Sequence, residues 1–211
     1  MNTLSLSQRA TVFLIDDDPS LLRALSRLVR SAGFESQSFP SPAEFLNAVS
    51  PLTRGCVVLD MHMPGTNGLK VQEQLTLKGC SLPVIFLTAY GDLPSCVDAM
   101  KSGALDFLSK PVKDRELLEA VEKGFLRCES RFLEMQKERE TRLRAATLSH
   151  REHEVFSLVA TGLPNKVIAE RLGICEKTTK VHRGHVMQKM SAGSLAELVL
   201  MAVQLGLIPG R

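Results

Sequence analysis

The first 124 residues alternate short apolar runs with amphipathic stretches, and this alternation constrains the fold more than any other feature of the chain. The apolar runs predict strands at 11–15, 34–39, 56–59, 84–88 and 104–109. The stretches between and after them predict helices near 19–32, 42–50, 67–78, 94–102 and 113–123. Five strand–helix repeats predict a doubly wound α/β domain, with a five-stranded parallel sheet covered by helices on both faces.

Beyond residue 124 the chain has no strand pattern. Residues 125–147 contain no proline, mix charges of both signs and predict a helical linker with a thin apolar stripe at Leu126, Leu133 and Met135. Such a helix either bridges two domains through solvent or forms a short dimeric coiled coil. Residues 148–211 predict a small all-α domain with helices near 149–161, 165–172, 176–190 and 194–205. We therefore expect three segments, at 1–124, 125–147 and 148–211.

Charge is distributed unevenly along these segments. The net charge of +3 at pH 7 divides into −2 over residues 1–124, +2 over 125–147 and +3 over 148–211. An acidic N-terminal segment and basic C-terminal segments suggest different partners for the two halves of the chain. The imbalance is too small to establish nucleic-acid binding, so motifs must carry that inference.

The composition is that of an ordinary globular protein, with 44% hydrophobic and 23% charged residues. The first ten residues lack the apolar stretch of a signal peptide, and the most apolar stretch, 195–208, is too short to span a bilayer. We expect a cytoplasmic protein with no membrane partner. The five cysteines show no paired spacing, which argues against both a disulfide framework and a zinc site.

Acidic residues follow two of the predicted strands. Asp16, Asp17 and Asp18 come directly after the first strand, and Asp60 comes directly after the third. Because the carboxyl ends of parallel strands meet at one edge of a sheet, these carboxylates should converge and favour a hard cation such as Mg²⁺. The simpler interpretation is a helix cap, which Asp18 could provide just before Pro19. A helix cap needs only one Asp, so it does not explain why three consecutive Asp residues should lie near Asp60.

Two further residues belong to the same edge. Thr88 ends the fourth predicted strand, and Lys110 follows the fifth. A lysine, a hydroxyl and a metal ion around one carboxylate would stabilise the oxygens of a transferring phosphoryl group. The attacking group would be the carboxylate of Asp60, as in the formation of an aspartyl phosphate.

The segments LIDDD, VVLDMHMPGTNG, FLTAYGD and GALDFLSKP resemble the receiver domain of two-component response regulators over about residues 10–124. The resemblance implies a flavodoxin-like receiver fold in which Asp60 accepts a phosphoryl group from a cognate histidine kinase. It implies that Asp17, Asp60 and the carbonyl of His62 hold Mg²⁺, with Asp16 acting through metal-bound water. Lys110 would then pair with the phosphoryl group, and Thr88 would reorient to form a hydrogen bond with it.

The resemblance also assigns residues that tune the response. Phe107 occupies the switch position, where many family members have Tyr, so only the packing of its ring can change. Pro111 resembles the cis proline of the family. His62 and Tyr90 occupy positions that influence the lifetime of the phosphate. A bulky Tyr90 hindering the attacking water predicts a long-lived phosphate; alternatively, both side chains merely fringe the cleft.

The C-terminal segment contains a helix-turn-helix pattern. Residues 165–172 predict a short helix, Gly173, Ile174 and Cys175 a tight turn, and 176–190 a longer basic helix. A basic amphipathic helix is weak evidence by itself, since a solvated helix face has the same composition. The basic residues of the second helix are Lys177, Lys180, His182, Arg183, His185 and Lys189.

The strings LSHREHEV, GLPNKVIAERLGI and KTTKVHRGHVMQKM are stronger evidence, because together they resemble the LuxR-type DNA-binding domain over residues 148–206. With the receiver in front, the chain resembles the NarL/FixJ class, and FixJ-like regulators in particular. The resemblance implies that Lys180, Val181 and Gly184 face base edges of double-stranded DNA. Candidate phosphate contacts are Lys166, Lys177, Thr178, Arg183 and Lys189, with Asn165 contributing its amide.

Two residues depart from the family pattern. Gly184 replaces a longer side chain of many relatives, at a cost to the helix of roughly 1 kcal/mol relative to Ala. Thr179 replaces a usual Val at a position expected to be packed. His182 is either a DNA contact or a histidine satisfied in the interior. The last helix is unusually apolar, and in the family it pairs two DNA-binding domains, so dimers reading two half-sites are expected.

These observations predict a phosphorylation-dependent transcriptional regulator, not an enzyme, that forms a homodimer when phosphorylated and has RNA polymerase as a further partner. Phosphorylation would act by dimerisation or by releasing the DNA-binding domain from inhibition. A haloacid-dehalogenase-like phosphatase requires D-x-D, whereas the second residue after Asp60 is His62. A degenerate receiver would lack one of the site residues, and a receiver-only protein would lack residues 148–206.

Overall fold

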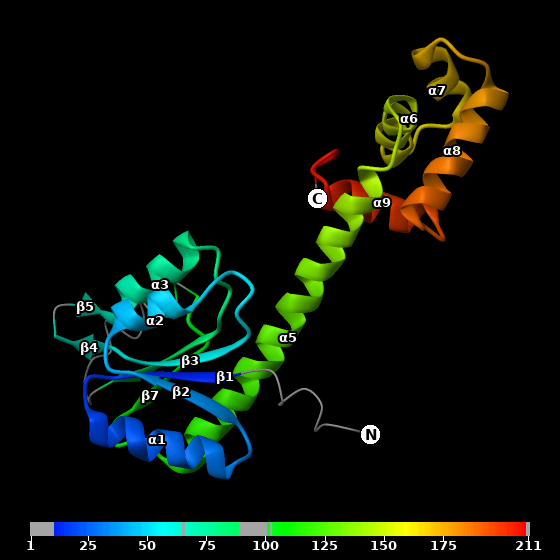
Figure 1. The fold of residues 1–211 in the computed structure, drawn as a ribbon. Coiled ribbons are helices and arrows are strands. Elements are labelled where there is room, and N and C mark those ends of the chain that lie inside the picture. Colours follow the sequence, from blue (N-terminus) through cyan, green and yellow to red (C-terminus); the bar gives the residue numbers. More distant parts are fainter. Residues whose placement is uncertain (1–10, 65, 89–100, 102, 210–211) are drawn as a thin grey trace. The chain divides into compact units, whose positions relative to one another are not determined.

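The computed structural model describes residues 11–64, 66–88, 101 and 103–209, and the chain divides into two compact units, 1–131 and 132–211 (Figure 1). Each unit is considered separately below. The helix predicted near 94–102 falls almost wholly outside the described residues, as does Tyr90.

The first unit is built on a parallel sheet. Its strands are β1 (Thr11–Ile15), β2 (Glu35–Phe39), β3 (Gly55–Asp60), β6 (Val84–Thr88) and β7 (Asp106–Ser109). They lie in the order β2-β1-β3-β6-β7, and every neighbouring pair is parallel. The predicted five-stranded doubly wound sheet is therefore confirmed. A small antiparallel pair, β4 (His62–Met63) and β5 (Thr66–Asn67), was not predicted.

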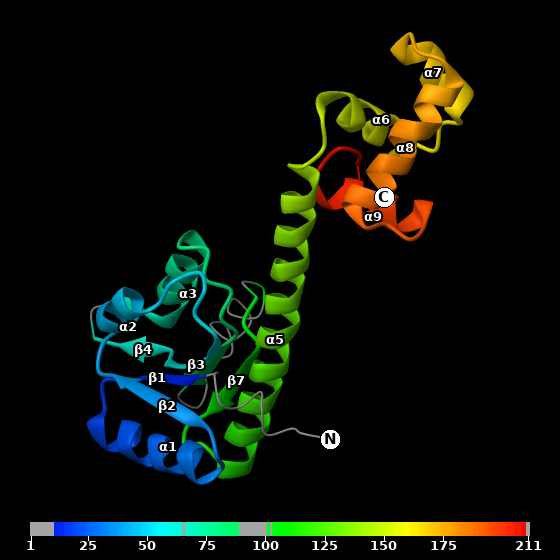
Figure 2. The ribbon, with the colours of Figure 1, turned by 45° about the vertical axis from the view of Figure 1, so that its right-hand side comes forward.

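Helices cover both faces of this sheet (Figures 1 and 2). One face carries α1 (Pro19–Ser31) and the first part of α5 (Asp114–Ala145), and the other carries α2 (Pro42–Ala48) and α3 (Gly68–Leu77). Both α1 and α2 begin with a proline, where a helix has no internal partner for the missing N–H.

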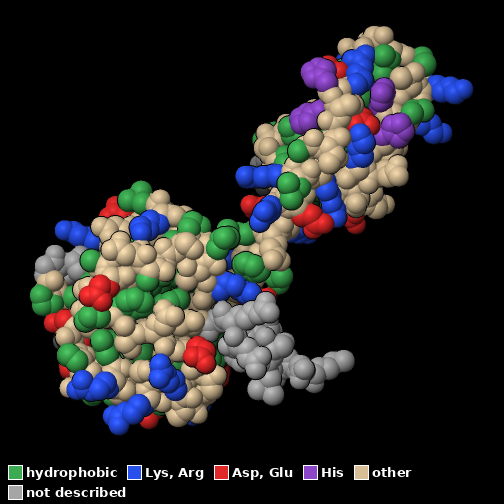
Figure 3. Space-filling model, in the orientation of Figure 1, with side chains coloured by type: hydrophobic (Ala, Val, Ile, Leu, Met, Phe, Trp, Pro, Cys, Tyr) green, Lys and Arg blue, Asp and Glu red, His purple; other side chains and the backbone are tan. Residues whose placement is uncertain are grey.

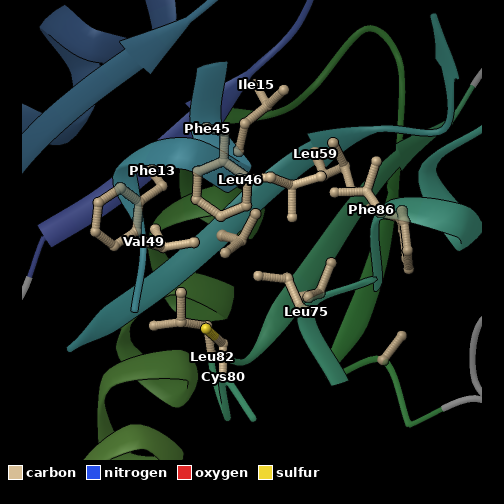
Figure 4. Packing of buried hydrophobic residues seen from close by; sticks show 14 of the residues in the cluster. Phe13, Ile15, Phe45, Leu46, Val49, Leu59, Leu75, Cys80, Leu82 and Phe86 are labelled. Carbon is tan, nitrogen blue, oxygen red and sulfur yellow. The ribbon is translucent and has the colours of Figure 1, made fainter. Parts of the chain in front are cut away.

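Each face has its own hydrophobic core, and β3 contributes to both. All six residues of β3 are buried, as expected for a central strand with helices on either side. Val57 and Leu59 enter the cluster beneath α2 and α3, whereas Cys56 and Val58 enter the cluster beneath α1 and α5. Figure 4 shows the first cluster, which includes Phe13, Phe45 and Phe86. These two cores fix β3, and therefore the residues that follow it.

Helix α5 runs for 32 residues without a break at Gly124. A Cβ added to Gly124 would lie 2.8 Å from the Cβ of Cys56, so the glycine allows α5 to approach β3 closely. Next along the helix, the Cys128 thiol accepts a hydrogen bond from the N–H of Gly55 at 3.3 Å, and Glu129 forms an ion pair with Arg54. Burial, together with the neighbouring Cys128, raises the pKa of the Cys56 thiol.

The second unit contains four further helices and the end of α5. They are α6 (His150–Ala160), α7 (Asn165–Leu172), α8 (Glu176–Met190) and α9 (Leu195–Gln204), which confirms the predicted all-α fold. Their shared core includes Phe156, Ile168, Val186, Met190 and Leu198.

The last turns of α5 are part of this second unit. The Thr141 side chain is buried, with its hydroxyl 3.4 Å from Oε1 of Gln204 in α9. The Arg144 guanidinium donates a hydrogen bond to the carbonyl of Met190, the last residue of α8, at 3.1 Å. Leu133 and Met135, further back along α5, are exposed.

Among the described residues, no single helix is long and apolar enough to cross a membrane. The pair α8 and α9, bent by 68° at the break between them, meets the length and composition criteria only when the two helices are taken together.

Substitution of Gly55 tests the packing of β3. Gly55 has a φ of +145°, and an added Cβ would lie 2.0 Å from the carbonyl oxygen of Thr11 on β1. We expect Gly55→Ala to lower the free energy of unfolding by more than about 3 kcal/mol in urea denaturation. Gly33→Ala is the matched control, because Gly33 also has a positive φ but open space around it. Its cost should be about 1 kcal/mol, and equal losses in the two variants would contradict the steric argument.

Candidate functional site

The acidic residues predicted at the strand ends are brought together. In the register of β1 and β3, Ile15 lies beside Leu59, so the next residues, Asp16 and Asp60, are neighbours at the carboxyl edge of the sheet. Carboxylate oxygens of Asp16, Asp17 and Asp60 all lie within 4.8 Å of one another. Asp16 and Asp60 are buried, whereas Asp17 is exposed. The cluster therefore has a buried floor and an opening to solvent.

Asp18 has a different role from its two neighbours. Its carboxylate accepts a hydrogen bond from the N–H of Ser20 at 2.7 Å and caps α1, with Pro19 as the first helical residue. Asp16 in turn accepts a hydrogen bond from the N–H of Asp18 at 2.8 Å. The cap accounts for Asp18 alone and leaves the other carboxylates to be explained.

The ammonium group of Lys110 lies between the two buried carboxylates. Its Nζ atom is 2.8 Å from Oδ2 of Asp16 and 3.0 Å from Oδ2 of Asp60. Burial alone would lower the pKa of Lys110, but the hydrogen bonds and charges of Asp16 and Asp60 outweigh it, so the pKa lies above its ordinary value. Lys110 is therefore a cation throughout the physiological pH range. The peptide bond between Lys110 and Pro111 is cis.

Thr88 lies at the same edge, on the strand next to β3. Asp60 pairs with Leu87, so Thr88 is one residue further along, and its side chain is buried. The carbonyl of Thr88 accepts a hydrogen bond from the N–H of Lys110 at 2.8 Å, which ties the ends of β6 and β7 together. His62 is exposed, and its N–H lies 3.3 Å from Oδ1 of Asp60. Phe107, on β7, is 40% exposed.

The donor set at this edge suits a hard divalent cation. Its atoms are carboxylate oxygens, which Mg²⁺ prefers, and they repel one another when no cation lies between them. Lys110 offsets part of that repulsion from one side. The residues present therefore fit a magnesium ion together with a phosphoryl group.

The second site is the helix-turn-helix. Helix α7 ends at Gly173, whose φ of +63° is the left-handed conformation that ends many helices, and α8 begins after Cys175. The buried face of α8 includes Val186, Met190 and Thr179, whose hydroxyl lies 3.4 Å from the carbonyl of Cys175. A hydroxyl at this packed position is thus accommodated by a local backbone partner.

The opposite face of α8 is exposed and basic. It carries Lys177, Lys180, Val181 and Gly184, three of which the sequence predicted to face base edges. Lys166 is exposed on α7, and Thr178 is half-buried beside Cys175. Figure 3 shows Lys and Arg side chains projecting from the helical unit around α8.

Two predicted DNA-contacting residues have partners within the domain. The Arg183 guanidinium donates a hydrogen bond to Oδ1 of Asn165 at 3.1 Å, which links α8 to the start of α7. Lys189 donates to Oε2 of Glu152 at 2.6 Å and to the carbonyl of Thr147 at 3.2 Å. Both residues therefore have a structural role, and their contact with DNA stays a prediction.

Glu152 was not singled out by the sequence. Its buried carboxylate accepts hydrogen bonds from Lys189 and from the N–H of Ser149, and lies 3.5 Å from Nδ1 of His185. The Lys189 hydrogen bond, followed by that of Ser149, lowers the pKa of Glu152 from 4.5 to about 2. Ser149 and Glu152 form a capping box, so one carboxylate both caps α6 and holds α8 against it. The S-x-x-E spacing was a signal for the cap, but not for the contact with Lys189.

His182 is half-buried in α8. Its Nδ1 atom is buried and has no hydrogen-bond partner among the described residues. Neither of the two interpretations offered for His182 from the sequence is established by this arrangement.

Comparison with known proteins finds a family for each of the two units. Residues 12–122 match the response regulator receiver domain, and residues 146–202 match the luxR family of bacterial regulatory proteins. Nodulation protein W of Bradyrhizobium diazoefficiens is 45% identical over 201 residues, covering 95% of this chain and 88% of that protein. Transcriptional regulatory protein FixJ of Azorhizobium caulinodans is 42% identical over 198 residues, 94% of each chain.

Two solved structures of response regulators are similar to this chain over most of its length. The response regulator StyR superposes with a TM-score of 0.78 at 44% identity, covering 92% of this chain and 98% of that one. Full-length FixJ from B. japonicum has a TM-score of 0.57 at 36% identity, covering 95% and 98%. A parallel sheet with an acidic edge, joined to a helix-turn-helix domain, defines a response regulator that acts on transcription. The chain belongs to the NarL/FixJ class, whose members are transcription regulators rather than enzymes.

Removal of the Glu152 charge tests the link between α6 and α8. We expect Glu152→Gln to lower the free energy of unfolding of the helical unit by on the order of 2 kcal/mol at neutral pH, because Lys189 loses its charged partner. Since the folded pKa is about 2, this stabilisation is present above the ordinary value of 4.5 and is lost as the pH falls toward 2. The difference in the free energy of unfolding between wild type and Glu152→Gln, measured with urea, should therefore become smaller over that pH range.

The control is Glu170→Gln, which removes an exposed carboxylate of α7. It should leave the pH dependence of unfolding unchanged. If the difference in the free energy of unfolding between wild type and Glu152→Gln stays constant from about pH 6 to about pH 2.5, the ion pair of Glu152 with Lys189 does not stabilise the domain as proposed.

Proposed function

We propose that this chain is a phosphorylation-dependent transcriptional regulator of a two-component system, in which a cognate histidine kinase phosphorylates Asp60. The observation that carries the proposal is the contact of one ammonium group, that of Lys110, with two buried carboxylates at the carboxyl edge of the sheet. Of these two, Asp60 is the one that ends the central strand β3, with Thr88 at the end of the next strand.

The reaction transfers a phosphoryl group from a phosphohistidine of the kinase. An Oδ atom of Asp60 attacks phosphorus, a P–O bond forms, the P–N bond to the imidazole breaks, and the imidazole takes up a proton. Lys110, now paired with Asp16 and Asp60, then pairs with an oxygen of the new phosphoryl group. The N–H of His62, already 3.3 Å from Asp60, lies beside the accepting carboxylate.

Asp16, Asp17, Asp60 and the carbonyl of His62 would hold Mg²⁺. When bound, the ion supplies neutralisation of charge on the phosphoryl oxygens. Without a cation, Asp17 and Asp16 would repel the incoming phosphoryl group, so their role is to make acceptance dependent on the ion.

The phosphoryl charge is transmitted through Thr88 and Phe107. A hydrogen bond from the Thr88 hydroxyl to the phosphoryl group would move Thr88 and let the ring of Phe107, now partly exposed, repack. The consequence is either dimerisation or release of the DNA-binding domain from inhibition. Both raise the affinity for paired half-sites.

The C-terminal domain binds double-stranded DNA with α8 in the major groove. Lys180, Val181 and Gly184 face base edges, while Lys166, Lys177, Thr178, Arg183 and Lys189 contact phosphates.

The receiver domain spans residues 1–124, the linker helix 125–147 and the DNA-binding domain 148–211. The protein acts in the cytoplasm, where the kinase and DNA meet, with RNA polymerase as a further partner.

Replacement of the acceptor tests the phosphorylation step. After incubation with acetyl phosphate and Mg²⁺, intact-mass measurement should find one phosphoryl group on the wild-type protein and none on Asp60→Asn. Asp18→Asn is the control: it removes a neighbouring charge but keeps the cap of α1, because Asn caps helices as well as Asp does. It should be labelled like wild type. Labelling that survives in Asp60→Asn would place the acceptor elsewhere, and turnover of phosphate monoesters in that variant would favour a phosphatase.

A charge on α9 tests how the dimer forms. Leu200, on α9, is 64% exposed, and we expect Leu200→Glu to weaken binding of the phosphorylated protein to a two-half-site duplex by about tenfold or more. Thermal stability should change little, because the side chain is mostly exposed. Leu133→Glu places the same charge on the thin apolar stripe of α5, through which a coiled coil would form. If this variant loses paired binding and Leu200→Glu does not, the dimer forms through a coiled coil of α5.

A further inference from the structure

Gly184 lies in the interior of α8, and the folded domain gives no reason for a glycine there. It is exposed, its φ is not positive, and a Cβ added to it would meet nothing within 4 Å. Glycine is among the poorest helix formers, so its presence lowers the stability of α8. Neither packing nor backbone conformation needs this glycine, which directs attention to what the exposed face of α8 contacts.

Val181 lies one turn before Gly184 on the same face, with half of its side chain exposed. A helical side chain leans toward the N-terminus and covers the turn before its own Cα. Any long side chain at position 184 would therefore lie over Val181. The glycine leaves Val181 uncovered, and these two exposed residues are called here the Val181–Gly184 patch.

The surroundings of this patch are cationic. Lys177 and Lys180 are exposed on the same face, four residues and one residue before Val181 along the helix. An exposed apolar patch beside two ammonium groups complements a polyanion that itself presents a small apolar group. In the major groove of DNA that group is the C5-methyl of thymine, flanked by phosphates and by hydrogen-bonding base edges.

We propose that the Val181–Gly184 patch receives the C5-methyl group of a thymine in each half-site, and that Gly184 determines specificity at this base pair. The inference rests on the proposed function, since it takes α8 to lie in the major groove. Contact with the methyl group removes apolar surface of both Val181 and the base from water. A longer residue at position 184 would occupy the space that the methyl group needs.

The test begins with the full-length protein phosphorylated by acetyl phosphate, which is used to select duplexes from a random library. Each thymine of a selected duplex is then replaced by deoxyuridine, which lacks only the C5-methyl group. At one thymine per half-site we expect affinity to fall about three- to tenfold, and replacement at the other thymines to have little effect.

Variants then assign that thymine to the patch. Val181→Ala and Gly184→Gln should each reduce the ratio of thymine to deoxyuridine affinity at that position to about one, while Gly184→Gln raises the melting temperature. Lys177→Gln is the matched control, because loss of a phosphate contact weakens both duplexes equally and preserves the ratio.

Two results would overturn the inference and leave the proposed function standing. They are a selected duplex in which no deoxyuridine replacement changes affinity, and a thymine preference that survives in both Val181→Ala and Gly184→Gln. Failure to enrich any sequence, with or without phosphorylation, would overturn the inference together with the proposed function.

Discussion

One ammonium group between two buried carboxylates organises the receiver. Lys110 lies within 3.0 Å of both Asp16 and Asp60, which would otherwise repel each other where water is largely excluded. Strand order makes this contact: β1 and β3 are neighbours and deliver the two acids, while β7, beyond β6, delivers the lysine. The hydrophobic clusters on both faces of β3 hold that order in place. The chemistry at the sheet edge therefore depends on apolar packing on both faces of β3.

The helical unit uses a buried charge in a similar way. The Glu152 carboxylate caps α6 and binds Lys189 near the end of α8, so the recognition helix is held by an ion pair as well as by its apolar face. Arg183 and Asn165 hold the middle of α8 to α7. These contacts use cations of α8 within the domain and leave Lys177 and Lys180 on the exposed face. Arg183 and Lys189 therefore orient α8 through contacts within the domain, whereas Lys177 and Lys180 are exposed.

The sequence predicted the regular elements well, because their periodicity and caps are local. The helix at 165–172 and the strands at 11–15 and 84–88 have the predicted ends, and the acidic edge follows from strand order alone. It did not predict β4 and β5, since two-residue strands have no periodicity. It separated the helix near 113–123 from the linker because the composition changes there, whereas α5 is continuous. The close approach of Gly124 to Cys56 appears only in three dimensions. The sequence did not predict the ion pair of Lys189 with Glu152, because the two residues lie 37 positions apart in the chain.

The contacts of the last turns of α5 determine at which residue a stable DNA-binding fragment of this protein can begin. Thr141 is buried beside Gln204 of α9, and Arg144 holds the carbonyl at the end of α8. Both residues precede residue 146, where the match to the luxR family begins. A DNA-binding fragment truncated at that boundary would lose the hydrogen bond to the end of its recognition helix and expose the side of α9 that Thr141 covers. A fragment that starts at Phe132 keeps both, and is the smallest one that retains the compact unit intact.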